Sequence, residues 1–394
     1  MPLIFLFVIL FIKRIIYINK KLWKERKINM VSTVLKKRFC KDNEYPINIY
    51  KDPYFSERLK FFGFYEEWKK YVETVEQFGG ENKFLEHCNI IQEKIIDLIK
   101  NNEAYKKFET FDMSLYPPFG IQRSRNSIYK KTNTGKILLS IDLSNANFNA
   151  LRKFDESLVI NKKNYYEFIS EFTEIEHIRK SKYIRQVIFG HTNPKRQLRI
   201  EKHLIGQFIP IVLKTVLSKE EYMAELDKKA DDPTNILIAY MDDEIVFDVS
   251  NIECTMWDAI IKNIEDFSQK TDIPIKYDFF VLKKIIRIIK QVNSEEEAIS
   301  ETDFYAKESI YPSQNKGKVV FKGVNPIVYP IVYGNYFGKP ISDSEKVFYH
   351  ENMIARIIDD VRYEILDSTQ TYEKMEGVIF EDIANSRYTE EVSE

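Results

Sequence analysis

Two short apolar segments flank an acidic run in the middle of the chain. Residues 236–239 and 245–247 are apolar and rich in β-branched side chains, and Asp242, Asp243 and Glu244 lie between them. Apolar runs of this length predict two β-strands, and the short acidic connection predicts a hairpin. Adjacent aspartates repel each other, and a divalent cation with hard oxygen ligands offsets that repulsion. A solvated Asp-Asp turn is the alternative interpretation.

An earlier strand also ends in a carboxylate. Residues 137–141 are mainly apolar and predict a buried strand, and Asp142 follows them directly. A carboxylate at the end of a buried strand is costly unless it is paired, hydrogen-bonded or metal-bound. Asp242 follows Asp142 by 100 residues, so the intervening chain must form helices and return to the central sheet. The alternative interpretation is a strand followed by an N-cap or a turn.

Apolar spacing of three or four residues dominates much of the remaining chain and predicts helices, together with a few more strands. The predicted helical segments are residues 31–108, 164–209 with a break at 190–194, 255–269 and 344–365; the predicted strands are 275–282 and 317–324; the acidic segments 295–303 and 367–394 are predicted as a linker and a loosely ordered tail. Residues 326–338 interleave aromatic with turn residues, a pattern that suits base stacking or core packing. Helices mixed with antiparallel strands predict an α+β fold.

Composition narrows the class of protein. The 394 residues suffice for a large core and two or three subdomains. The 59 basic and 60 acidic residues nearly cancel, so nucleic acid would have to bind to local basic patches. An aromatic content of 14 % with few glycines and prolines excludes a disordered chain. Three widely separated cysteines predict neither a metal site nor a disulfide set, and favour a cytoplasmic, reducing compartment.

The amino terminus has an unusual pattern. Residues 3–12 are continuously apolar, and a basic segment follows through Lys27. Ten apolar residues are fewer than the roughly 20 that a spanning helix needs. Three interpretations stay open: a membrane anchor, a buried or interfacial helix, or a translated extension upstream of a functional start at Met30.

Two basic segments are candidates for binding phosphate. The first, residues 121–136, contains Arg123 and Arg125. The second begins a helix at Pro194 and carries Lys195 and Arg196. Cations in such positions neutralise triphosphate or backbone charge. Ordinary solvated surface segments have the same pattern.

The acidic motifs resemble those of a known enzyme family. Tyr-Met-Asp-Asp between two apolar strands resembles the third catalytic motif of reverse transcriptases. The strand that ends at Asp142 resembles their first motif, with Ala146 at the small position and Phe148 at the second aromatic position. Asn147 is a departure, because retroviral enzymes usually carry there an aromatic ring that excludes the ribose 2′-hydroxyl. An amide is smaller than such a ring and can bond a hydroxyl, so the resemblance implies no sugar preference.

The resemblance implies a right-hand polymerase with an antiparallel-sheet palm that performs template-directed nucleotidyl transfer to a 3′ end. Asp142, Asp242 and Asp243 would then be the catalytic and metal-binding residues, holding two Mg²⁺ or Mn²⁺ ions. The implied substrate-binding residues are Arg123, Arg125, Asn147, Phe148, Lys195 and Arg196. The implied partners are a nucleic acid template and primer, nucleoside triphosphates, and proteins of a replication or defence complex.

The expected domains are an apolar and basic extension (1–29), a helical N-terminal region (30–110), a fingers and palm core (111–324), and a thumb-like region with an acidic tail (325–394). The match to the second motif is loose: Phe189-Gly190 and Asn193-Pro194 stand near the expected places, without the Gln-Gly pair.

Other assignments compete with an active reverse-transcriptase-like polymerase. Residues 114–117, Ser-Leu-Tyr-Pro, resemble the first motif of family B DNA polymerases, but the aspartate of that motif would fall on Phe111 rather than Asp112. A catalytically inactive palm-fold, nucleic-acid-binding subunit is the main alternative. A metal-independent interaction protein with an accidental Tyr-Met-Asp-Asp is a third possibility.

Overall fold

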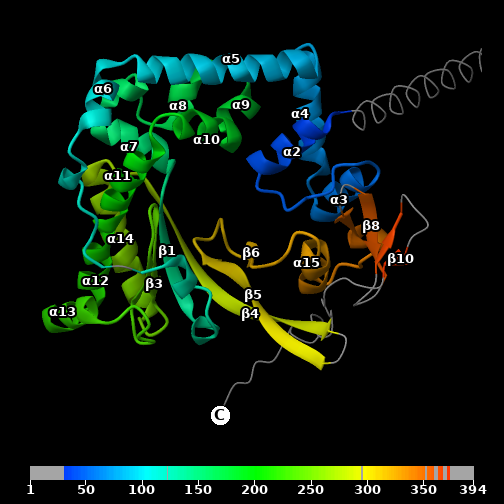
Figure 1. Ribbon diagram of the computed structural model, residues 1–394. Helices are drawn as coiled ribbons and strands as arrows, with labels where there is room; N and C mark the ends of the chain where they lie inside the picture. The colour runs from blue at the N-terminus through cyan, green and yellow to red at the C-terminus, as the bar shows by residue number, and fades with distance from the viewer. Residues whose placement is uncertain are drawn as a thin grey trace, which may run out of the picture. The chain divides into compact units, whose positions relative to one another are not determined.

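The chain is built from helices and two antiparallel sheets, which confirms the predicted α+β class (Figure 1). The computed structural model describes residues 31–121, 123–293, 296–350, 353–358, 363–366 and 371–372. The chain divides into two compact units. Unit 1 comprises the described parts of Met1–Ile90, Glu176–Ile184 and Asn325–Met375, and unit 2 comprises Ile91–Ile175 and the described parts of Arg185–Val324.

Unit 1 combines helices with a small four-stranded sheet. Its elements are α2 (Thr33–Asp42), α3 (Tyr54–Phe62), α4 (Tyr65–Gln77), the first half of α5 (Glu81–Lys100), α9 (Glu176–Lys180), the start of α10 (Lys182–Gly190), α15 (Tyr329–Phe337), the short helix η5 (Asp343–Lys346), β7 (Val347–His350), β8 (Met353–Ile357), β9 (Tyr363–Ile365) and β10 (Thr371–Tyr372). Phe39, Phe55 and Trp68 meet edge to face in its core. The helical prediction for residues 31–108 is confirmed.

One prediction for unit 1 is wrong. Residues 344–365, predicted as a helix, form η5 and strands β7, β8 and β9. Contacts between these strands favour strands over a helix in this segment. Val347 and Ile354 are buried, and Arg356 forms an ion pair with Glu364 on the adjacent strand. The buried Arg58 of α3 also donates hydrogen bonds to backbone carbonyl oxygens from Ser344 to Val347.

Unit 2 is built around a six-stranded sheet. Its elements are the second half of α5, α6 (Glu103–Thr110), η1 (Met113–Leu115), η2 (Arg125–Ser127), η3 (Lys131–Asn133), β1 (Ile137–Leu143), α7 (Ala146–Phe154), η4 (Glu156–Val159), α8 (Tyr165–Ser170), the rest of α10, α11 (Pro194–Gly206), α12 (Phe208–Val216), α13 (Lys219–Asp227), β2 (Leu237–Tyr240), β3 (Glu244–Asp248), α14 (Cys254–Thr271), β4 (Ile275–Asn293), β5 (Glu296–Tyr311) and β6 (Val319–Lys322). The strand order is β2-β3-β1-β4-β5-β6, with antiparallel pairing throughout.

Most elements predicted for unit 2 are confirmed, including the acidic hairpin, the strand before Asp142 and the helix of residues 255–269. The predicted linker at residues 295–303 is wrong, because residues 296–303 belong to β5. Strand β4 likewise continues past residue 282 as far as Asn293. The two strands pair from Phe279 and Tyr311 to Asn293 and Glu296, so each supplies backbone hydrogen-bond partners of the other in a long hairpin (Figure 1). Residues 326–338 contain helix α15.

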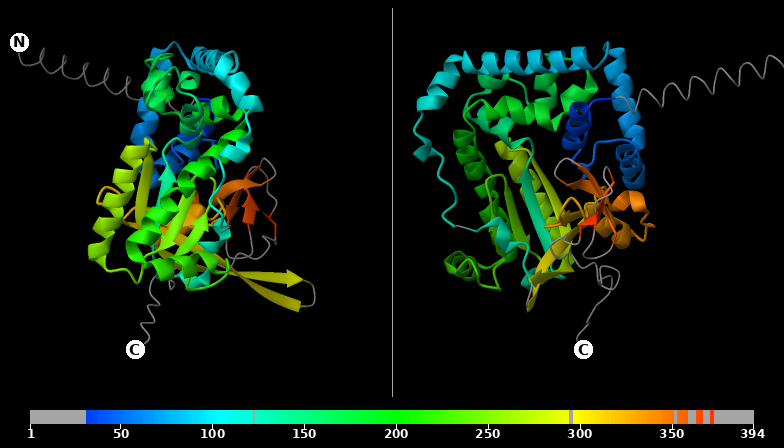
Figure 2. Two further views of the ribbon diagram at one scale, coloured as in Figure 1. Left: turned by 90° about the vertical axis from the view of Figure 1, so that its left-hand side faces the viewer. Right: turned by 45° about the vertical axis from the view of Figure 1, so that its right-hand side comes forward.

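Helices cover one face of the large sheet (Figure 2). Trp257 of α14 stacks on Phe279 of β4 with 4.8 Å between ring centroids. The Tyr240 hydroxyl, at the end of β2, donates to the carbonyl oxygen of Lys202 in α11 at 2.6 Å. Because side chains alternate along a strand, the intervening residues face the other way.

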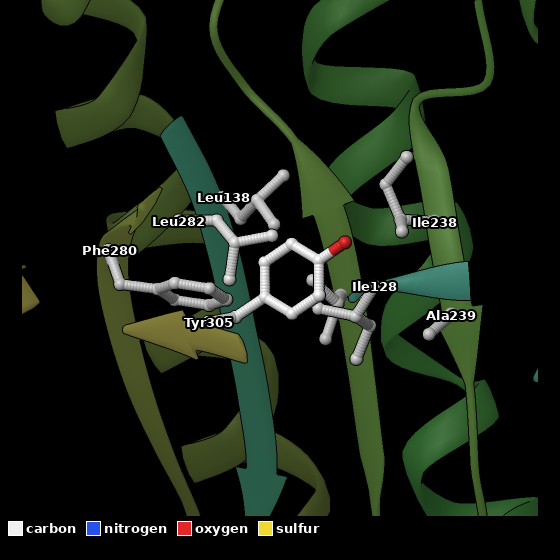
Figure 3. Packing of buried hydrophobic residues seen from close by; sticks show 8 residues of the cluster. Ile128, Leu138, Ile238, Ala239, Phe280, Leu282 and Tyr305 are labelled. Atoms are coloured by element: carbon white, nitrogen blue, oxygen red, sulfur yellow. The ribbon is translucent and has the colours of Figure 1, made fainter. Parts of the chain in front are cut away.

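The other face carries an apolar cluster at one end (Figure 3). Its buried members are Ile128, Leu138, Ile238, Ala239, Val246, Phe280, Leu282 and Tyr305. Ser140 and Asp142 follow Leu138 on the same face, since they are two and four residues farther along β1. One face of β1 thus runs from an apolar end to a carboxylate.

No helix within the described part of the chain has the length and apolar character to cross a membrane. The amino-terminal segment of residues 1–29 and most of the acidic tail lie outside the described residues. The three interpretations of that segment, and the cytoplasmic location, stay predictions.

Candidate functional site

Asp142 lies between an acidic and a basic residue on the neighbouring strands. Its direct partner on β3 is Glu244, and its partner on β4 is Lys276. Directly opposed residues of antiparallel strands have Cβ atoms about 5 Å apart. The pairing of three strands therefore fixes the position of Asp142 and gives it one repulsive and one attractive neighbour.

The acidic hairpin is tied to the end of β1. The Met241 amide donates to the Glu244 carbonyl oxygen at 2.8 Å and closes the connection between β2 and β3. The Leu143 amide donates to the Asp243 carbonyl oxygen, also at 2.8 Å. These bonds bring Asp243 next to the residue that follows Asp142. The two acidic motifs, far apart in sequence, meet where β1 ends beside the connection between β2 and β3.

The charges at this end of the strands act strongly on one another. Burial, followed by the charges of Asp243 and Glu244, raises the pKa of Asp142 to about 7, while Lys276 and Lys307 oppose the shift. The pKa of Asp243 is raised by burial and then by Glu244. Burial therefore disfavours the charged form of both aspartates, and their acidic neighbours add to that effect.

A fourth carboxylate at the site, Glu201 of α11, was not predicted. Its side chain is 2 % exposed and accepts a hydrogen bond from Asn147 Nδ2 at 2.9 Å. Burial, then the charges of Asp243 and Asp242, raise its pKa to about 8. The sequence contains a signal for it, because Glu201 occupies the apolar face of α11 beside Ile200 and Leu204. A charged residue on such a face indicates a special environment.

Glu244 was also missed as a residue of the site, although it directly follows the aspartate pair. It accepts a hydrogen bond from Ser140 Oγ at 2.6 Å. Arg125 lies within ion-pair distance of it, at 3.9 Å between Nη2 and Oε2. Glu244 therefore lies beside Asp142 with its own polar partners.

Side-chain bonds fix the turn from β1 into α7. Asn145 has the left-handed backbone conformation, with φ of 48°. Asn149 Nδ2 donates to the Ser144 carbonyl oxygen at 2.5 Å, and Arg152 Nε donates to Asn149 Oδ1 at 3.1 Å. Arg152 is in turn paired with Asp272 after α14. The first turn of α7, which carries Asn147, is thus anchored relative to Asp142.

Phe148 points into the core of unit 2. Its ring is fully buried and packs against Tyr165, Phe168 and Phe189. Of these two residues predicted to bind substrate, Phe148 is buried, whereas its neighbour Asn147 is partly exposed. The packing of Phe148 holds α7 in place, and a contact with substrate stays a prediction.

The four basic candidates differ in accessibility. Arg123 is buried, and its Nη2 donates to the Lys228 carbonyl oxygen at 2.9 Å and to Asn235 Oδ1 at 3.3 Å. Arg196 is half-buried and donates to the Phe111 carbonyl oxygen. Arg125 and Lys195 are exposed. The two exposed cations are the ones that a phosphate group can reach from solvent, and Arg125 among them lies within ion-pair distance of Glu244.

The carboxylates offer the oxygen ligands of a divalent-cation site, but they are not spaced to surround a cation. Among the residues that the structure describes, no three His, Cys, Asp or Glu side chains are arranged to hold a metal ion. Asp142, Asp242 and Asp243 nevertheless offer hard oxygen atoms, which Mg²⁺ and Mn²⁺ prefer. Burial and then the charges of Asp243 and Glu244 raise the pKa of Asp142, and a bound cation would favour its charged form.

Comparison with protein-family models, curated proteins and solved structures finds no match for this chain. The resemblance to reverse transcriptases therefore rests on the sequence motifs alone.

Proposed function

We propose that unit 2 is a palm-like nucleotidyltransferase that extends a 3′ end with nucleoside triphosphates on a nucleic acid template. One observation carries the proposal: Asp142, near the end of β1, and the Asp242-Asp243 pair, between β2 and β3, lie beside each other at one end of these strands, joined by the bond from the Leu143 amide to Asp243. An accidental Tyr-Met-Asp-Asp would not require the other acidic strand end to lie beside it. The convergence therefore favours the catalytic assignment over the interaction protein.

In this proposal Asp142, Asp242 and Asp243 hold two divalent ions. Bound Mg²⁺ or Mn²⁺ supplies activation of the 3′-hydroxyl and stabilisation of the leaving pyrophosphate. The protein keeps the carboxylates in place through the pairing of β1 with β3 and β4. Lys276, opposite Asp142, limits the repulsion among the acids.

The exposed cations would guide the substrate. Arg125 lies beside the hairpin, within ion-pair distance of Glu244. Lys195 stands at the start of α11, where the free backbone amides of a helix also attract anions. Both suit a role in attracting triphosphate or template backbone.

Primer extension by the chain starting at Met30 tests the proposal. DNA and RNA templates, both nucleotide sets, and Mg²⁺ and Mn²⁺ are to be compared for the wild type and for Asp242→Ala/Asp243→Ala. We expect the double variant to lose at least about 100-fold in rate, because catalysis by metal ions requires their ligands. The matched control is Asp258→Ala/Asp266→Ala, which removes two exposed aspartates from α14 and should retain activity. Equal activity of both double variants would contradict the proposal.

A catalytically inactive nucleic-acid-binding subunit is the second candidate. Two observations favour it: the described residues contain no formed metal-binding group, and the second motif lacks the Gln-Gly pair. Folded protein that binds a primer-template in a gel-shift assay, yet extends it under none of the conditions, would support this candidate instead.

A further inference from the structure

The side chain of Tyr240, two residues before Asp242, is bonded to helix α11. It is 2 % exposed, so it offers almost no surface to a substrate. Its hydroxyl donates to the Lys202 carbonyl oxygen at 2.6 Å and accepts from the Phe119 amide at 3.0 Å. The Lys202 ammonium also lies 5.1 Å from the centre of the Tyr240 ring. The hydroxyl thus joins three segments of unit 2: strand β2, helix α11 and the loop before η2.

A β-bulge in β2 turns Tyr240 toward α11. The pairing of β2 with β3 shifts by one residue between Leu237 and Ala239, so β2 contains one residue more than its partner there. In a regular strand Ile238 and Tyr240 would share one face. Here Ile238 belongs to the apolar cluster on the face away from the helices (Figure 3), whereas Tyr240 contacts α11. Bulges of this kind redirect a side chain, often beside an active site.

Gly206, the last residue of α11, makes room for the Tyr240 hydroxyl. A Cβ atom at position 206 would lie 2.6 Å from Tyr240 Oη and 3.1 Å from Cβ of Phe119. Atoms in packed interiors do not approach so closely, so the tyrosine would have to move. The backbone of Gly206 is helical, and alanine is the better helix former. The close approach of α11 to the end of β2 is therefore what requires glycine here.

The position of Tyr240 limits that of the carboxylates. Two residues span at most about 7 Å, so Asp242 lies close to wherever Tyr240 is held. On the other side, the Leu143 amide donates to the Asp243 carbonyl oxygen at 2.8 Å. The acidic hairpin is thus fixed by α11 before the aspartate pair and by β1 at the pair itself.

We infer that Tyr240 and Gly206 are positioning residues, which keep Asp242 and Asp243 where they bind metal ions. The inference rests on the metal-binding aspartates of the proposed function. Tyr240 is enclosed and Gly206 has no side chain, so both act through the aspartates rather than on a reacting atom. A misplacement of about 1 Å in a catalytic geometry costs on the order of 100-fold in rate. Changes at this contact should therefore lower kcat and the affinity for metal ions, while binding of the primer-template is retained.

Steady-state primer extension tests the inference. We expect Gly206→Ala to lower kcat about 10- to 100-fold, because the added methyl group displaces Tyr240. Tyr240→Phe should lower kcat about 10-fold through loss of the two hydroxyl bonds. The KM for primer-template should stay within about 2-fold of the wild type in both variants. Tyr222→Phe removes the hydroxyl of a partly exposed tyrosine on α13 and should keep the wild-type kcat.

The double variant Gly206→Ala/Tyr240→Phe separates positioning from general damage to the fold. The added methyl group meets the Tyr240 hydroxyl oxygen most closely, and phenylalanine lacks that atom. We therefore expect the double variant to regain at least about 5-fold in kcat relative to Gly206→Ala. Independent effects would instead multiply, to a loss of about 100- to 1000-fold.

Binding of Mn²⁺, followed by electron paramagnetic resonance of the free ion, probes the carboxylates without catalysis. We expect Gly206→Ala and Tyr240→Phe to bind Mn²⁺ about 10-fold more weakly than the wild type, because each disturbs the support of the ligands. Gly190→Ala adds the same methyl group at the end of α10, where nothing lies within 4 Å of the Cβ atom, and should bind Mn²⁺ like the wild type. Thermal melting identifies a variant that does not fold. If Gly206→Ala does not fold, Tyr240→Phe still measures kcat and Mn²⁺ affinity.

Each outcome bears on a different claim. Wild-type kcat and Mn²⁺ affinity in the folded single variants, a loss confined to KM, or a multiplicative loss in the double variant overturns the positioning role and leaves the proposed polymerase intact. Mn²⁺ binding that weakens as expected, in a protein that extends no primer, supports the positioning role and overturns the polymerase. Neither Mn²⁺ binding nor extension by folded wild-type protein overturns both.

Discussion

At the scale of single residues, the candidate site is characterised by carboxyl groups that are buried away from water. Asp142 and Glu201 both have pKa values well above the ordinary range, mainly because they are buried. Lys276 and Lys307 reduce the shift of Asp142, and Asn147 reduces that of Glu201. Folding therefore makes the ionised form of both acids less favourable. Perturbed pKa values of this kind are common at functional sites.

These shifts predict how stability depends on pH. Folding raises the pKa of Asp142 from 3.8 to about 7 and that of Glu201 from 4.5 to about 8. The folded state therefore binds protons that the unfolded state releases, and the free energy of unfolding falls as pH rises through this window. In EDTA, we expect the melting temperature to decrease between pH 5.5 and 8.5. The decrease should be smaller in Asp142→Asn/Glu201→Gln.

Addition of Mn²⁺ provides the complementary measurement. A cation binds the deprotonated carboxylates, so it should raise the melting temperature more at pH 8.5 than at pH 5.5. Asp258→Asn, at an exposed position on α14, serves as the control. A metal response that is independent of pH, or equal in the double variant, would show that these acids do not bind the ion.

At the scale of elements, β1 links the apolar core to the site. Leu138 is fully buried at one end of the strand, and Asp142 lies four residues farther along on the same face. Pairing with β3 and β4 fixes the register of the strand, since a shift by one residue would turn every side chain to the opposite face. The strand therefore couples core packing to the placement of the acid.

Truncation of Leu138 should show how strongly this core is packed. Leu138→Ala removes a fully buried side chain from the cluster around Phe280, and we expect a loss of about 2–5 kcal/mol in the free energy of unfolding. Leu198→Ala is the matched control, because Leu198 on α11 is 39 % exposed and should cost less than about 1 kcal/mol. Urea unfolding followed by tryptophan fluorescence compares the two. Similar losses would contradict this account of the core.

At the scale of the whole molecule, charge is balanced and cannot attract nucleic acid by itself. The formal net charge is −1, so binding of a template would depend on local cations such as Lys195 and Arg125. Each phosphate contact adds about 0.9 to the slope of log affinity against log salt concentration. A small number of contacts therefore predicts a shallow salt dependence.

Lys195→Ala tests this local attraction. We expect it to weaken primer-template binding on all sequences alike and to reduce the salt slope by about one, as the loss of one phosphate contact implies. Lys262→Ala removes an exposed lysine from α14 and should leave the slope unchanged. Fluorescence anisotropy at several salt concentrations provides the measurement. Identical slopes for both variants would remove Lys195 from the proposed interface.

The sequence by itself determined the local elements whose pattern is complete within a few residues. The strand before Asp142, the two strands around Asp242 and Asp243, and the amphipathic helix of residues 255–269 all follow from the spacing of their apolar residues. The order of the acidic motifs also predicted that they belong to one sheet, and Asp142 and Glu244 are direct partners across it.

Only the tertiary structure decided the features that depend on distant partners. Residues 296–303, 347–350, 353–357 and 363–365 form strands because other strands pair with them, which their own composition does not reveal. The Asn147–Glu201 pair joins residues 54 positions apart, and the burial of Arg123 depends on Lys228 and Asn235. Local spacing determines which face of an element is apolar. Packing of whole elements determines which polar groups meet, and this contact defines the candidate site.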